Sequence, residues 1–241
     1  MAGGTSRPLN RTNLLFAWFL TTGLSVTTAF PLPPPLETGH LLGRGMPSGT
    51  PPVPLGDELY ALGWSPSNNF AILEHRTGIK SPSIRFCVLN MVDDQLLYEE
   101  DWPDWGDGDQ KDGWWAAREK GVEAVFSRYQ LVPTDRQMGV FPLIVDNEFY
   151  TLALRKGHSF ADSAWINGLE VVVNSTGRGL KTVAEGVGFW RWASLLGFIP
   201  SPFENRVALI LVVQPAGWAG EKQPLRFLVS GLSLKAGFPK P

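Results

Sequence analysis

The residue types best suited to binding chemistry lie together in one acidic, tryptophan-rich stretch, residues 99–115. It holds seven carboxylates and four tryptophans within 17 residues. Carboxylate oxygens on a glycine-rich turn suit a hard cation such as calcium. Exposed indoles beside carboxylates suit a sugar, because the rings stack on its C–H face while the carboxylates accept hydrogen bonds from its hydroxyl groups. The candidate ligand-binding residues are Trp102, Asp104, Trp105, Asp107, Asp109 and Asp112.

The calcium hypothesis depends on three of these acids. Asp107, Asp109 and Asp112, followed by Gly113, loosely resemble a calcium loop. Their spacing is not that of an EF-hand, so Asp104 or backbone carbonyls would have to complete a different site. The competing interpretation is a solvated turn in which Asp112 caps the next helix and the acids lie at its positive end. This second interpretation is favoured. No cofactor is predicted, and calcium is the alternative.

The carbohydrate hypothesis competes with burial of the same tryptophans. Trp114 and Trp115 lie at the start of a predicted helix, and indoles bury large areas. Adjacent helical positions cannot both point squarely inward. We therefore expect at least one of the two to pack in the core.

Residue types typical of catalysis are scattered elsewhere. His40, His75 and His158 are too far apart in sequence to indicate a metal site, and Ser159 with Asp162 does not make a triad, which fold geometry assembles. The sequence has no nucleophile elbow, phosphate-binding glycine loop or metalloprotease histidine pair. No catalytic residues are predicted, and a non-catalytic protein is favoured over an enzyme.

Composition narrows the class of protein. The 241 residues include 21 Lys and Arg against 23 Asp and Glu, a net charge of −2, which disfavours nucleic acid as a partner. Hydrophobic residues make up 44%, enough to build a core. The single cysteine, Cys87, excludes an intramolecular disulfide and lies in an apolar run, so we expect it to be buried and inert.

The first residues predict export. Residues 1–29 read as a signal peptide, with Arg7 and Arg11 ahead of an apolar segment and small residues before a cut at Phe30. The alternative is an uncleaved anchor, but Leu14–Ala29 is shorter than the roughly 20 apolar residues that a spanning helix needs. We expect a secreted or periplasmic protein with no membrane span after cleavage.

The rest of the chain divides into a tether and one domain. Residues 31–56 carry eight prolines and five glycines, so residues 30–56 are predicted to be a Pro/Gly-rich tether. Residues 57–241 are predicted to form a single β-rich domain. A helix is expected over Trp114–Gln130, because apolar residues there recur at three, four and seven.

Two segments of this domain, at about residues 60–90 and 194–232, share an ordered set of motifs. Leu-Gly-aromatic, Pro-Ser, Asn, Ala, Gly-x-Lys-x-Pro and Arg-Phe-x-Val recur in the same order. Each segment predicts a three-strand antiparallel meander, too small to bury a face alone. We infer a duplication. The expected fold class is mainly β (β-rich α+β), with antiparallel strands from the duplicated unit and one substantial helix.

The same motifs carry a resemblance to a known family, over about residues 60–234. The chain resembles an uncharacterised bacterial family of predicted secreted proteins, a domain of unknown function. The residues that carry it are Gly63–Ala71, the helix around Ala116–Tyr129, Leu196–Ala208, Gly217–Gly220 and Arg226–Gly231. The resemblance implies export and no known catalytic residues.

Two functional hypotheses follow. The first is an exported non-catalytic envelope or periplasmic protein that binds an unknown partner or ligand, such as an envelope protein or a saccharide. The alternative is a calcium- or carbohydrate-binding protein or enzyme that uses the loop 99–115.

Overall fold

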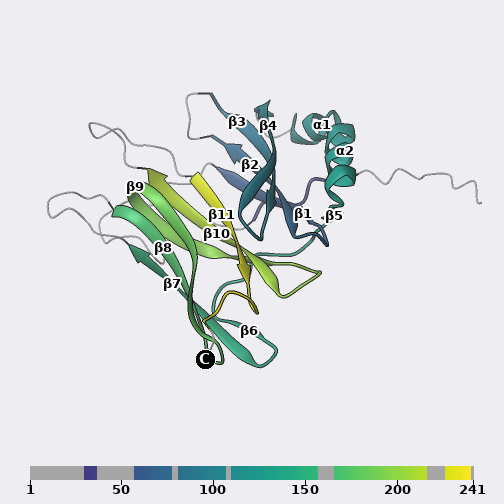
Figure 1. Ribbon diagram of the computed structural model, residues 1–241. Coiled ribbons are helices and arrows are strands. Elements are labelled where there is room, and N and C mark those ends of the chain that lie inside the picture. The colour runs from purple at the N-terminus through teal and green to yellow at the C-terminus, as the bar shows by residue number, and fades with distance from the viewer. Residues whose placement is uncertain are drawn as a thin grey trace, which may run out of the picture. The chain divides into compact units, whose positions relative to one another are not determined.

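The computed structural model describes residues 30–36, 57–77, 81–106, 110–156, 166–215 and 226–239. It confirms a mainly β fold with antiparallel sheets and one substantial helix (Figure 1). The strands are β1 Glu58–Trp64, β2 Asn69–Arg76, β3 Ser83–Asn90, β4 Gln95–Pro103, β5 Val132–Pro133, β6 Leu143–Val145, β7 Glu148–Lys156, β8 Ile166–Ser175, β9 Gly179–Pro200, β10 Arg206–Pro215 and β11 Arg226–Ser233. The helices are α1 Lys111–Ala116 and α2 Glu119–Tyr129. None of the helices in the described part of the chain is long and apolar enough to cross a membrane.

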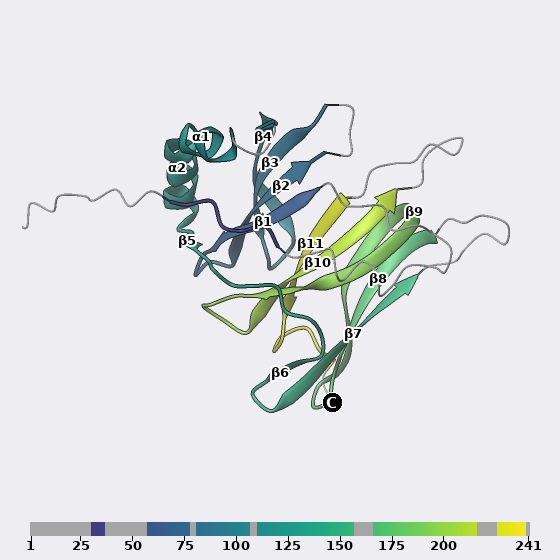
Figure 2. The same ribbon diagram turned by 180° about the vertical axis from the view of Figure 1, so that it is seen from behind.

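Within the described residues the strands form two sheets. Sheet A has the order β4-β3-β2-β1-β5, and sheet B has the order β11-β10-β9-β8-β7-β6. Both are antiparallel throughout. Helices α1 and α2 lie on the side of sheet A that faces away from sheet B (Figures 1 and 2).

The two sheets pack through alternate residues of their central strands. Leu59 and Ile72 of sheet A share one apolar cluster with Ala208, Ile210 and Val212 of β10. The intervening residues of β10 point to the other face of sheet B, because successive side chains on a strand alternate. There they meet side chains from β7, β8 and β11 in a second cluster. Sheet B therefore curls, since β7 and β8 are not neighbours of β10.

The hairpin between β1 and β2 follows its turn chemistry. Ser65 donates its amide to the carbonyl of Asn69 at 2.9 Å, and its hydroxyl accepts the Asn69 amide at 3.0 Å. Asn68 has a φ of 67°, the left-handed conformation that asparagine tolerates.

The segments proposed as duplicates each form an antiparallel meander, β1-β2-β3 and the end of β9 with β10 and β11. The ladder between β1 and β2 skips Leu62, and the ladder between β9 and β10 skips Leu196. Both bulges therefore lie at the leucine of the Leu-Gly-aromatic motif.

In both meanders the glycine of that motif lies against a backbone carbonyl oxygen. A Cβ on Gly63 would lie 2.6 Å from the carbonyl oxygen of Val132, and a Cβ on Gly197 would lie 2.3 Å from that of Gly139. Each glycine thus lets the segment after α2 approach the first strand of a meander.

The strand pairings of the two meanders can be compared with the order of the shared motifs. They agree in the first and third strands of each meander and differ in the second. Gly63 pairs with Ala71, which pairs with Val88. In the second meander Gly197 pairs with Ile210, which pairs with Val229. The alanine that the two motif sets share matches Ala71 with Ala208 instead. A shift of two residues keeps the same side chains on the same face, so packing tolerates it. The duplication itself stays a prediction.

The single helix expected over Trp114–Gln130 is two helices, which corrects that prediction. The amide of Arg118 bonds the Trp115 carbonyl at 2.8 Å, three residues back, which tightens the chain between α1 and α2. The Arg118 guanidinium also donates a hydrogen bond to the Trp114 carbonyl oxygen at 3.0 Å. Asp112 is not the N-cap, because Gln110 holds that position and Asp112 lies in the first turn.

Part of the predicted tether belongs to the fold. The amide of Leu36 donates to the carbonyl of Leu59 at 2.8 Å, and the Leu36 side chain is buried in the cluster between the sheets. The predicted signal peptide and residues 37–56 lie outside the described residues.

Candidate ligand-binding corner

The acidic stretch singled out in the sequence runs along β4 and into α1. The structure buries Trp102 and Trp105, which are 9% and 5% exposed, and leaves Asp112 exposed. The side chain of Asp104 is partly exposed. Residues 107–109, which include Asp107 and Asp109, lie outside the described residues.

Asp104 and Trp105 meet residues from three other elements that the sequence did not single out. Glu58 and Tyr60 lie two apart on β1 and so share a face of sheet A. His75 on β2 is the register partner of Glu58. Lys111, the first residue of α1, lies over the same face. We call Glu58, Tyr60, His75, Asp104, Trp105 and Lys111 the acidic aromatic corner.

The ammonium group of Lys111 is at the centre of this corner. Its Nζ donates to the hydroxyl of Tyr60 and lies 3.4 Å from Oε2 of Glu58. It is also 4.6 Å from the ring centroid of Tyr60 and 4.6 Å from that of Trp105. Carboxylate, phenol and indole thus converge on one cation, which is stabilised by charge and by the ring quadrupoles.

His75 lies between the two carboxylates. Its Nε2 is 2.7 Å from Oδ1 of Asp104, and its Nδ1 is 3.7 Å from Oε2 of Glu58. The imidazole also packs against Trp105, with ring centroids 4.3 Å apart. This contact helps to hold the indole in the corner.

The electrostatics of the corner keep Tyr60 neutral. Burial, followed by the hydrogen bond to Glu58, raises the pKa of the Tyr60 hydroxyl well above its ordinary value of 10.0. The hydroxyl therefore stays protonated near neutral pH, where it donates to Glu58 and accepts from Lys111. It acts as a fixed dipole between a carboxylate and an ammonium.

The tryptophans form an interior cluster. Trp102 contacts Phe86 and Trp114 at centroid distances of 5.4 and 5.5 Å, and Trp114 contacts Trp105 at 5.4 Å. The guanidinium of Arg118 lies 3.9 Å from the centroid of Trp114. Trp102 and Trp105 therefore do not offer the exposed ring faces that sugar stacking needs. Trp115 is buried, as expected for one of the helical pair.

A metal site is not formed by the described part of the corner. Among the residues that the structure describes, no group of three or more His, Cys, Asp or Glu side chains could hold a metal ion. The predicted calcium ligands Asp107 and Asp109 are outside those residues, and the side chain of Asp112 is exposed.

Sequence reasoning missed Glu58, Tyr60, His75 and Lys111. The alternation of Glu58 and Tyr60 on a predicted strand was a usable signal for a polar position on a buried face. The pairing of His75 with Glu58 depends on the hairpin register, and the position of Lys111 depends on how α1 packs. Neither can be obtained from spacing along the chain.

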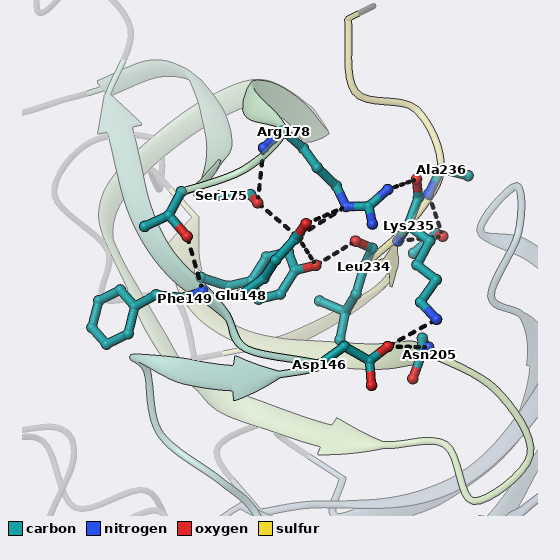
Figure 3. A network of polar contacts seen from close by, with 12 residues as sticks. Asp146, Glu148, Phe149, Ser175, Arg178, Asn205, Leu234, Lys235 and Ala236 are labelled. Atoms are coloured by element: carbon teal, nitrogen blue, oxygen red, sulfur yellow. Dashed lines mark hydrogen bonds and ion pairs between the residues drawn. The ribbon is translucent and has the colours of Figure 1, made fainter. Parts of the chain in front are cut away.

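A second polar network fixes the C-terminal segment on sheet B (Figure 3). Glu148 accepts hydrogen bonds from Tyr150 at 2.6 Å, from Ser175 at 3.0 Å and from Nε of Arg178 at 2.9 Å. The hydroxyl of Tyr150 also lies 2.7 Å from the carbonyl oxygen of Leu234. Each donor of this network has a protein acceptor, so we interpret it as structural.

Comparison with known proteins adds no relative. No family model matches the sequence, and no curated protein and no solved structure matches it either. The resemblance to the family of secreted proteins therefore stays a prediction.

Proposed function

We propose that the chain is an exported, non-catalytic envelope or periplasmic protein and that its acidic aromatic corner binds the ligand. One observation carries the proposal. Glu58, Tyr60 and Trp105 converge on a single ammonium group at a place where Glu58 and Lys111 still reach solvent. The signal-like residues 1–29 support export.

The chemistry of the corner favours recognition over catalysis. His75 lies between Asp104 and Glu58, and these contacts orient its ring. The raised pKa of Tyr60 keeps its hydroxyl from acting as a base near neutral pH. Fixed charges and fixed ring faces are what a binding site uses to orient a ligand.

A thermal-shift screen of the full chain tests the proposal. The panel contains organic ammonium ions, calcium with an EDTA control, and envelope saccharides. A ligand that prefers the folded state raises the Tm by mass action. We expect one class to give a saturable rise that is reduced in Asp104→Asn and in Glu58→Gln.

Asp135→Asn is the matched control. Asp135 is an exposed acid on the segment after β5, and its substitution also removes one negative charge. The rise should survive in this variant. A screen without any saturable shift, or shifts that are equal in all four proteins, would overturn the proposal. A calcium or saccharide shift that is lost in the corner variants would keep the site and assign it to those ligands.

A further inference from the structure

Lys111 is held as a bound cation would be. Its ammonium group contacts a carboxylate, a phenol oxygen and two aromatic rings. The rings of Tyr60 and Trp105 stand at 87° to each other with centroids 5.9 Å apart, so the hydroxyl end of Tyr60 and the ring of Trp105 border the ammonium group on two sides. Aromatic rings attract organic ammonium groups, and an adjacent carboxylate adds to that attraction.

The walls and the occupant differ in how firmly the fold holds them. Tyr60 is fully buried on β1, and Trp105 is 5% exposed, packed against His75 and Trp114. Lys111 instead begins a helix of six residues whose N-cap, Gln110, makes no side-chain capping bond. The Lys111 side chain keeps 27% of its surface exposed, so its ammonium group can turn to solvent on its flexible stem at less cost than moving a wall.

We propose that Glu58, Tyr60 and Trp105 form a cation cage that Lys111 fills in the free protein, and that the ammonium group of an organic ligand displaces Lys111 from it. This inference rests on the proposed function and names the ligand class. The corner holds two carboxylates, Glu58 and Asp104. Exchange of one cation for another keeps a positive charge beside Glu58, whereas a neutral ligand would remove it.

The composition of the cage selects an organic cation over a metal ion. Calcium takes six to eight oxygen ligands. The cage offers a carboxylate and a phenol oxygen, and its other wall is an indole face. Aromatic faces stabilise a diffuse, weakly hydrated charge such as trimethylammonium.

Lys111 acts as an internal competitor in this scheme. The affinity of a ligand is reduced by the fraction of molecules in which the cage is open. Removing the competing ammonium group should therefore strengthen binding without adding a contact.

Calorimetry on the full chain with choline as the probe tests this. We expect wild type to bind choline weakly and Lys111→Ala to bind it with a Kd at least tenfold lower, whereas Lys111→Arg, which refills the cage, shows no gain. In Lys111→Ala combined with Glu58→Gln, the gain should be lost. The neutral isostere 3,3-dimethylbutan-1-ol should not bind any of the four.

Three results would overturn the inference: equal Kd values for wild type and Lys111→Ala, equal binding of the isostere, or binding by Lys111→Ala with none by wild type. The last would mean that the substitution had created the cavity. Circular dichroism checks folding, and Lys111→Gln repeats the test with the same expected gain if Lys111→Ala does not fold. If choline fails while calcium or a saccharide acts through Asp104, this inference fails and the proposed function stands. If nothing binds at the corner, both fail.

Discussion

The carboxylate of Asp94 accepts the amide of Gly231 at 2.6 Å, which joins the turn after β3 to the outer edge of β11. The second oxygen of Asp94 accepts the hydroxyl of Ser230, also at 2.6 Å. An edge strand presents unpaired N–H groups that other chains could pair with. Asp94, in the turn between β3 and β4 of sheet A, thus covers part of the β11 edge of sheet B. The lack of a side chain at Gly231 also lets the backbone of Met91 lie close to β11.

Gly231→Ala should be strongly destabilising. A Cβ at this position would lie 1.8 Å from the carbonyl oxygen of Met91, so the backbone of one sheet would have to move. We expect the free energy of unfolding to fall by about 1–3 kcal/mol, the range of overpacked sites. Urea denaturation measures it. Gly121→Ala in α2 is the control, because its Cβ would meet nothing within 4 Å, and should stabilise by about 0.5–1 kcal/mol. Equal effects of the two substitutions would contradict the close contact.

Cys87 should be unreactive in the folded protein. Burial raises the pKa of its thiol to about 12, and the side chain is 2% exposed. The reactive thiolate is therefore scarce and shielded at pH 8. A disulfide reagent such as DTNB should label the thiol only as fast as the chain opens, and fully in urea. Rapid labelling of native protein at pH 8 would show that the Cys87 side chain is accessible to the reagent, which would contradict its burial on β3.

Stability should decline at alkaline pH because the fold raises the pKa of two tyrosines. Burial, then the hydrogen bond to Glu100, raises the pKa of Tyr98 to about 12, and burial raises that of Tyr60 further. Above pH 10 the unfolded chain loses these protons while the folded chain keeps them, so the free energy of unfolding falls as pH rises from 10 towards 12. Phenolate absorbance should lag in native protein and jump on unfolding. In Tyr98→Phe the part of the decline due to Tyr98 should disappear.

Glu148 should stabilise the protein above pH 4.5 and cease to do so in acid. Its hydrogen bonds from Tyr150, then from Arg178, hold the pKa of the carboxyl below its ordinary value of 4.5. The folded state therefore prefers the ionised form, and the contribution is lost as pH falls through the lowered pKa. The Tm of Glu148→Gln should lie below that of wild type at pH 7, and the gap should close in acid. A gap independent of pH would point to packing instead.

Local chemistry made several features predictable. Alternating and apolar runs indicated the strands, Asn68 occupies the left-handed turn position that its side chain favours, and Cys87 is buried as its apolar run indicated. The helical spacing predicted that at least one of Trp114 and Trp115 is buried, and Trp115 is. These features depend on residues within one turn or one strand, so the sequence carries them directly.

The tertiary structure decided the rest. The register of β10 is shifted by two residues from the position that the shared motifs predict. A shift of two leaves every side chain of β10 on the same face of the sheet, so the motifs alone could not fix the register. Trp102 and Trp105 are interior rather than exposed, because α1 and its neighbours cover them.

The acidic aromatic corner is the clearest case of a site that the sequence alone does not reveal. By itself the sequence determined that acids and aromatic rings are abundant in residues 99–115. Only the fold decided that Asp104 and Trp105 meet Glu58 and His75 from another hairpin. Contacts between residues far apart in sequence arise when sheets and helices pack their apolar faces, and polar side chains then find their partners in the geometry that packing leaves.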